Sequence, residues 1–184
     1  AKRGSNAPAI CPNCTLLVRP IFTEQLSQNE IIPSTTSKNL CTAIIDCINA
    51  EAKIINLSLA LSYPTLNNDF ELNYVLDLAA KKGIIIVAAA GNQGTVRSSQ
   101  ITQHKWVIPV VATNNHGMPM QLSNLSNSIG LNGFSAPGEN ITSLDSENKS
   151  LTLSGTSAAA PFITGIIALL WSEFPELPAQ EIKN

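Results

Sequence analysis

The 184-residue sequence has little charge, few aromatic residues and only two histidines. Charged residues make up 13% of the chain and aromatic residues 5%, with eleven basic against thirteen acidic side chains. The formal net charge of -2 provides no basic surface for nucleic acid or for an anionic membrane. No unbroken apolar run reaches the roughly 18 to 20 residues that cross a bilayer. We therefore expect neither nucleic-acid nor membrane partners.

What the chain has in quantity is hydrophobic residues, at 44%, enough to exclude intrinsic disorder. Apolar runs alternate with segments of helical periodicity, and the runs are apolar on both faces. This alternation predicts an α/β fold in three layers, a parallel sheet with helices on both faces. The last helix is apolar nearly all round, so we expect it to be buried. Strands are expected at 15–22, 54–59, 84–90 and 106–112, helices at 40–48, 70–83 and 156–174, and an irregular segment at 114–133.

The four cysteines do not form a recognisable metal site. Cys11 and Cys14 have the C-x-x-C spacing of a disulfide or a zinc half-site, but no histidine lies nearby to complete the latter. Cys41 and Cys47 lie six residues apart on an expected helix and point to different faces. We favour buried, unpaired thiols, with a Cys11–Cys14 disulfide or half-site as the alternative, and we expect no metal and no cofactor.

The sharpest local motif is Ser154-Gly155-Thr156-Ser157-Ala158-Ala159-Ala160-Pro161. It places Ser157 in the first turn of the long apolar helix, where free N–H groups and the helix dipole stabilise a developing oxyanion. The alternative is a structural cap on a well-packed alanine helix.

A second motif, Ala88-Ala89-Ala90-Gly91-Asn92-Gln93-Gly94, follows a buried strand. Ligands of open parallel sheets bind beyond the carboxyl ends of the strands, where Asn92 could aim its amide into a cleft. The alternatives are a plain turn and a phosphate loop of a nucleotide-binding domain. The latter lacks both G-x-G-x-x-G and a following Lys-Ser/Thr.

Together these segments resemble the subtilisin-like serine proteases, the subtilase family. The resemblance is carried by Gly155–Pro161 as the nucleophile motif and Ala89–Asn92 as the oxyanion motif. Ile55–Leu59 resembles the strand that lines the substrate groove. Two further segments, 107–112 and 134–138, follow in the order of the family. The resemblance extends from about Ile10 to Asn184 and implies a subtilisin-like fold over the chain.

The resemblance implies roles for individual residues. Ser157 would be the nucleophile, and its N–H together with the Asn92 amide would bind the oxyanion. A peptide or protein substrate would pair as an added strand, in a groove without the acidic side chain that a basic substrate residue would need. Ala60 stands where the family usually has Gly, which puts a Cβ into the groove wall. The implied substrate-binding residues are Ser58, Leu59, Ala60, Ala89, Ala90, Gly91 and Thr156.

The His and Asp of the family's triad are missing from the expected places. His104 and His116 both follow Asn92 and read as ordinary loop histidines, while Asp46 lies on a helix in the wrong context. One interpretation is that residues 1–184 are part of a subtilase catalytic domain, truncated at the N-terminus, whose Asp and His lie upstream. The other is an inactive subtilase-like domain that binds peptides or partners. The compartment stays open.

Overall fold

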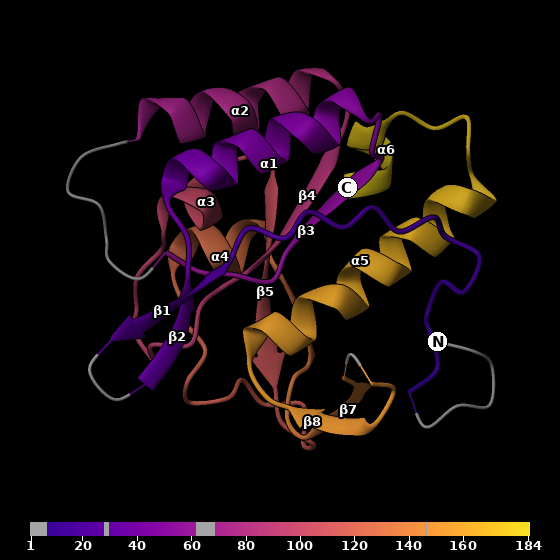
Figure 1. Ribbon diagram of the computed structural model, residues 1–184. Helices are drawn as coiled ribbons and strands as arrows, with labels where there is room; N and C mark the ends of the chain where they lie inside the picture. The colour runs from indigo at the N-terminus through magenta and orange to yellow at the C-terminus, as the bar shows by residue number, and fades with distance from the viewer. Residues whose placement is uncertain (1–6, 28–29, 62–68, 146) are drawn as a thin grey trace.

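In the computed structural model, which describes residues 7–27, 30–61, 69–145 and 147–184, four parallel strands form the central sheet. The strands stand side by side in chain order, β3-β4-β5-β6 (Figure 1). Their register pairs Ile54 with Ile85, Ile86 with Val107, and Val110 with Phe134. The strands are β3 (Ile54–Leu57), β4 (Ile85–Ala89), β5 (Val107–Thr113) and β6 (Phe134–Pro137).

Helices cover both faces of this sheet, which confirms the predicted three-layer α/β architecture. On one face lie α1 (Ser37–Asn49), α2 (Phe70–Lys81) and the short α3 (Gln100–Gln103). On the other lie α5 (Thr156–Glu173) and α6 (Ala179–Lys183), as Figure 1 shows. Side chains of β4 alternate between the two cores, because successive residues of a strand point to opposite faces. This explains why β4 is buried along its whole length.

Local signals fix the ends of the helices. Thr36 and Asp69 cap the amino ends of α1 and α2 by accepting hydrogen bonds from Asn39 N and Leu72 N. Gly83 adopts a φ of +67° just after α2, the left-handed conformation that closes a helix. The structure confirms the predicted positions of both helices, and these caps fix where the helices begin and end.

Two antiparallel hairpins and one short helix complete the fold, and none of them was predicted. The hairpins are β1 (Thr23–Ser27) with β2 (Glu30–Ser34), and β7 (Ile141–Leu144) with β8 (Ser150–Leu153). Within the segment predicted to be irregular, α4 (Asn127–Asn132) is capped by Ser126 and buries Ile129. Such short elements depend on their tertiary contacts more than on a periodic pattern.

Two expectations about individual elements need correction. Residues 15–22, predicted as a strand, have no ladder partner in the part of the chain that the structure describes. The long helix α5 is buried on one face only: Ala159, Ala160, Ile163 and Ile167 pack on the sheet, while Ile166 is 54% exposed. Its length and composition alone would also allow it to cross a membrane.

The cysteines divide into two pairs of different state. Cys11 and Cys14 form a disulfide, so the preference for unpaired thiols is wrong for this pair. Cys41 and Cys47 are free, and burial raises the pKa of both thiols. The disulfide closes a short turn, while Ile10 beside it packs against Gly165 of α5.

Candidate active site

The two sequence motifs meet at the carboxyl edge of the sheet. Asn92 follows the end of β4, and Ser157 lies in the first turn of α5, 65 residues later along the chain. Hydrogen bonds join the two motifs through Thr156, the residue before Ser157. Asn92 Oδ1 accepts from the Thr156 backbone N–H at 2.9 Å and from Thr156 Oγ1 at 2.9 Å. The structure therefore places Asn92 beside the start of the helix that carries Ser157.

Thr156 acts as a clamp on the oxyanion-motif loop. Its hydroxyl donates to Asn92 Oδ1 and accepts from the Gly91 N–H at 3.1 Å, and the residue is fully buried. Because Asn92 Oδ1 accepts hydrogen bonds from both the N–H and the hydroxyl of Thr156, the Asn92 amide is held in one orientation, with its Nδ2 group on the opposite side. Among the described residues, no hydrogen-bond acceptor is recorded for Nδ2, and Asn92 is exposed. An N–H donor therefore remains available to a ligand.

Gly155 allows this close approach. Its φ of +120° is accessible to glycine and rarely to other residues. A Cβ at this position would stand 2.8 Å from Asn92 Nδ2 and would force the Asn92 amide to move. The glycine before the helix is therefore required both by the backbone turn and by the position of the Asn92 amide.

Ser157 lies half-buried where the helix offers free donors. Gly155 O accepts from the N–H groups of Ala158 and Ala159, but no acceptor within the described chain is recorded for the Ser157 N–H or hydroxyl. The first N–H groups of a helix have no partner inside it, and the dipole of an 18-residue helix adds positive potential there. Ser157 thus has a hydroxyl and an N–H without recorded partners in the described chain, one residue after Thr156, whose N–H and hydroxyl bond Asn92 Oδ1.

A second network, which sequence reasoning missed, ties β3 to the same turn. Thr164 Oγ1 donates to Asn56 Oδ1 at 2.8 Å, Asn56 Nδ2 donates to Ser58 Oγ at 2.8 Å, and Ser58 Oγ donates to the Ser157 carbonyl at 3.0 Å. The Ser58 side chain therefore supports the helix start. In the sequence, Asn56 stands between two apolar residues, Ile55 and Leu57, which are buried in the structure. This alternation is the only sequence pattern that indicates that the Asn56 side chain points to the opposite face of the strand.

Asn124 supports the loop after β4 and was also missed. Its Oδ1 accepts from the backbone N–H groups of Gln93 and Thr95, at 3.1 and 3.2 Å. Its Nδ2 donates to the Ala90 carbonyl at 3.2 Å. Only 9% of Asn124 is exposed, so these bonds hold the loop from a buried position. Its sequence neighbourhood, rich in Asn and Ser, gave no motif that could have found it.

The remaining expected substrate-binding residues lie around this edge. Leu59 is half-buried against the core of α1 and α2, and Ala60 is exposed. Ala89 and Ala90 are 2% exposed, and Gly91 is buried, so a ligand would meet them mainly through the backbone. Thr156 is committed to its own clamp. No group of three or more metal-ligating side chains occurs in the ranges that the structure describes.

Neither histidine contacts Ser157. His104 lies before β5, at the amino edge of the sheet, where its Nε2 is 3.3 Å from Asp77 Oδ1 of α2. His116 is exposed in the turn after β5, and its N–H donates to Asn114 Oδ1. Among the described residues, the site therefore has a serine hydroxyl and N–H donors without recorded partners, and no imidazole contacts Ser157.

Comparisons with known proteins agree with this geometry. The sequence profile of the Peptidase S8 subtilase family matches residues 2–184, so the chain belongs to the subtilase family of serine proteases. Its relatives include a thermophilic serine proteinase of Bacillus sp. AK1, 34% identical over 140 residues, which are 76% of this chain and 33% of that protein. The major intracellular serine protease of Bacillus subtilis is 35% identical over 133 residues, 70% of this chain and 41% of that protein.

Solved structures give the same fold over more of the chain. The patellamide maturation protease PatA is 30% identical with a TM-score of 0.84, and the match covers 99% of this chain and 66% of that one. The prenylagaramide maturation protease PagA is 28% identical with a TM-score of 0.77, covering 84% of this chain and 57% of that one. The chain spans about a third to two fifths of the curated relatives' length.

Proposed function

We propose that residues 1–184 form part of the catalytic domain of a subtilisin-type serine endopeptidase, with Ser157 as nucleophile. The general base His and the Asp that orients it would come from polypeptide outside these residues. The observation that carries the proposal is the Thr156 clamp, which holds the Asn92 amide at the start of the helix that carries Ser157 and leaves Nδ2 without a recorded partner in the described chain. A purely structural helix cap would not need an exposed amide held in one orientation.

In the proposed reaction, Ser157 Oγ attacks the scissile carbonyl carbon while the His accepts the hydroxyl proton. The carbonyl oxygen becomes an oxyanion that receives hydrogen bonds from the Ser157 N–H and from Asn92 Nδ2. Collapse of the tetrahedral intermediate releases the amine with the proton from His and leaves an acyl-enzyme. Water, activated by the same base, then releases the acid.

The proposed substrate is a peptide or protein that pairs with the backbone of Ser58, Leu59 and Ala60 as an added strand. No backbone hydrogen bond is recorded for these three residues with any described part of the chain, so their groups are available. Ala89, Ala90 and Gly91 would wall the pocket for the residue before the scissile bond. This stretch has no acidic side chain, and we expect no preference for a basic residue there.

The alternative is a catalytically inactive, peptide-binding subtilase domain, favoured by the lack of a histidine beside Ser157 among the described residues. A fluorophosphonate probe, which labels only an activated serine, separates the two. We expect labelling of Ser157 in the full gene product and none in the isolated 184 residues. Failure to label the full product would support the inactive domain, and strong labelling of the isolated chain would refute an external base.

A further inference from the structure

Asp69, which caps the start of α2, is also held by two other helices. Its Oδ1 accepts the capping hydrogen bond from the Leu72 N–H at 3.0 Å, and its Oδ2 accepts from the Ser37 hydroxyl in the first turn of α1. Its backbone is bound by a third helix, through the side chain of Gln100 in α3. One residue therefore joins the starts of three helices.

Gln100 binds the Asp69 backbone with both ends of its amide. The Asp69 N–H donates to Gln100 Oε1 at 3.0 Å, and Gln100 Nε2 donates to the Asp69 carbonyl at 2.6 Å. A primary amide offers an acceptor and a donor side by side, so this pair of bonds imitates the bonds between two neighbouring strands. Because Gln100 is half-buried, the two bonds are partly shielded from water. We call this contact the Gln100 bridge.

The Gln100 bridge joins the connections that follow two neighbouring strands. Asp69 ends the connection from β3 to α2, and Gln100 begins α3 after the connection that leaves β4. Since β3 and β4 are adjacent and parallel, both connections leave the sheet at its carboxyl edge, where Asn92 and Ser157 lie. Figure 1 shows α3 close to the ends at which α1 and α2 begin. The bridge thus ties together two neighbouring segments of that edge.

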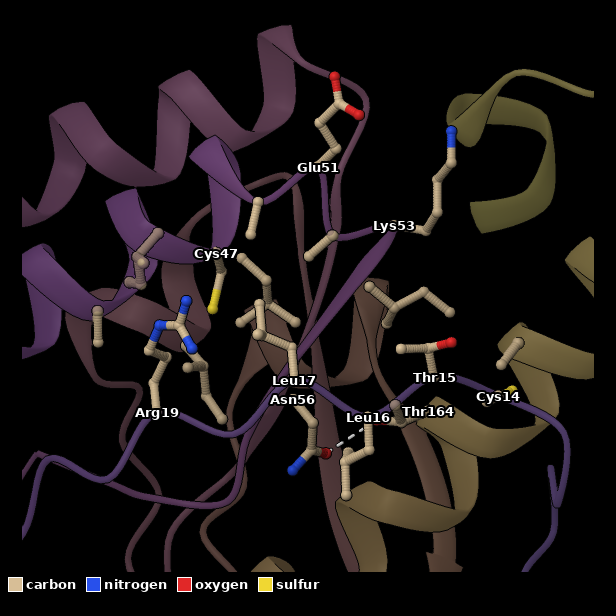
Figure 2. Close-up of a pocket in the computed structure, with 18 of the residues that line it drawn as sticks. Cys14, Thr15, Leu16, Leu17, Arg19, Cys47, Glu51, Lys53, Asn56 and Thr164 are labelled. Carbon is tan, nitrogen blue, oxygen red and sulfur yellow. Dashed lines mark hydrogen bonds between the residues drawn. The ribbon is translucent and has the colours of Figure 1, made fainter.

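The end of β3 and the residue after it are anchored on one side by α5. Asn56 Oδ1 accepts from the Thr164 hydroxyl, the bond drawn as a dashed line in Figure 2. Ser58 Oγ donates to the Ser157 carbonyl. Both anchors come from the helix that carries the proposed nucleophile, and they fix the point at which the β3 connection leaves the sheet.

The residues just after β3 are anchored on the other side by the core of α1, α2 and α3. Leu59 and Leu61 pack against this core, and Ile101, the residue after Gln100, belongs to it and is 2% exposed. Close-packed interiors deform little, so a shift of α3 is passed on to the side chains packed on the same core. The Gln100 bridge is therefore coupled by packing to the backbone of Ser58–Leu61.

We propose that Gln100 is a positioning residue that fixes the width of the pocket for the substrate residue before the scissile bond. This inference rests on the proposed function, in which the peptide lies along Ser58–Ala60 and that residue enters a pocket walled by Ala89–Gly91. The Gln100 bridge holds the β3 connection to α3, and α3 follows the loop whose other end is fixed by Asn124. Loss of the bridge lets the two walls move apart, so the pocket accepts larger side chains, while Ser157 keeps its own contacts.

The test compares two peptide p-nitroanilides that differ only in carrying Phe or Ala before the scissile bond. The ratio of their kcat/KM values does not depend on how much of the enzyme is folded, so a merely structural role leaves this ratio unchanged. In the full gene product, Gln100→Met keeps the length of the side chain and removes both bonds, and the Phe-to-Ala ratio should rise by about fivefold or more. Gln103→Met is the matched control, because Gln103 lies on the same short helix, is exposed and bonds the Ser98 carbonyl only at 3.4 Å. The control should leave the ratio within about twofold.

Asp69→Asn separates the Gln100 bridge from the cap of α2. This change alters the carboxylate that bonds Ser37 and Leu72 but keeps the backbone groups that Gln100 binds. The ratio should therefore stay within about twofold. An unchanged ratio in Gln100→Met, or an equal rise in Asp69→Asn or Gln103→Met, would overturn the proposal.

A second variant covers the case in which Gln100→Met does not fold, which circular dichroism would show. Gln100→Glu keeps an acceptor for the Asp69 N–H and loses the donor to the Asp69 carbonyl. It should raise the Phe-to-Ala ratio in the same direction by a smaller factor. If neither variant folds, Gln100 serves stability and the proposal fails.

Fluorophosphonate labelling of the unsubstituted full product separates this inference from the proposed function. A labelled Ser157 with hydrolysis of both peptides keeps the protease, and the ratio then decides the role of Gln100. A labelled Ser157 with an unchanged ratio in Gln100→Met overturns this inference alone. An unlabelled Ser157 without hydrolysis overturns the proposed function and this inference with it.

Discussion

The carboxyl edge around Ser157 and the outer edge of β3 differ in how completely their polar groups are paired. At the edge, Thr156, Asn92 and Asn124 are held by hydrogen bonds that converge from three separate segments. At the outer edge of β3, that strand and residues 15–22 leave backbone groups without recorded partners in the described chain, and Leu16 and Val18 are exposed. The polar groups of the first region are thus paired within these 184 residues, whereas those of the second are not paired in the described part of the chain.

This difference shows that the loop of Asn92 and the start of α5 are held in place by contacts within these residues. Oxyanion donors work by being fixed before the reaction, and the clamp that fixes Asn92 lies wholly within β4, α5 and the turns beside them. Under the proposed function, the base would come from polypeptide outside these residues. Three sets of variants test this contrast and a fourth, at the start of α2, gives a reference outside it, from the largest expected effect to the smallest.

The two faces of α5 should respond very differently to truncation. Ile163 is 8% exposed on the sheet-facing side, and Ile166 is 54% exposed on the other. Ile163→Ala should lower the free energy of unfolding by about 2–5 kcal/mol, because it leaves a cavity in the core. Ile166→Ala in the 184-residue chain should change it by about 0.5 kcal/mol or less. Urea denaturation measures both, and equal losses would mean that both faces are covered.

Asn92→Ala should impair chemistry without weakening substrate binding. In subtilisin, loss of the oxyanion asparagine costs about 10²–10³ in kcat, and we expect a fall of that size in the full gene product. KM should stay within about twofold, because the amide bonds the developing oxyanion more than the ground-state carbonyl. Asn132→Ala, at an exposed position of α4, is the matched control. A rise in KM with unchanged kcat would assign Asn92 to substrate binding instead.

Thr156→Val should loosen the clamp while keeping the shape of the side chain. The change removes the hydroxyl that bonds Asn92 Oδ1 and the Gly91 N–H, leaving the latter without its partner. We expect a loss of about 1–3 kcal/mol in stability, the usual cost of an unsatisfied buried polar group. Hydrogen exchange at Gly91 should become faster. Thr156→Ser, which keeps the hydroxyl, should restore slow exchange, and a failure to do so would separate exchange from the clamp.

The smallest expected effect is the pH dependence at the start of α2, outside both regions. A hydrogen bond from Ser37 and another from the Leu72 N–H hold the pKa of Asp69 below its ordinary value. A lowered pKa stabilises the fold above the unfolded-state value, about 3.9, and this stability is lost as the pH falls through the lower folded-state value. Asp69→Asn should therefore flatten the acid limb of the stability curve. An unchanged acid limb would contradict this assignment.

Much of the fold could be predicted from sequence because it rests on local signals. The apolar runs predicted β3, β4 and β5, and helical periodicity predicted α1 and α2, whose ends the structure shows to be capped at Thr36, Asp69 and Gly83. The motifs around Asn92 and Ser157 were found as candidates because each combines a small-residue turn with one polar side chain. Asn124 and Asn56 escaped prediction because their importance lies in partners about 30 to 108 residues away.

The sequence by itself determined the alternation of strands and helices and the family to which the chain belongs. Both follow from patterns among residues close together in the chain, namely hydrophobic periodicity and short motifs. Only the tertiary structure decided which face of α5 is buried, how Thr156 orients the Asn92 amide, and that residues 15–22 lie opposite an open edge of β3. Composition cannot supply these facts, because burial and hydrogen-bond orientation depend on what the rest of the chain places next to each residue.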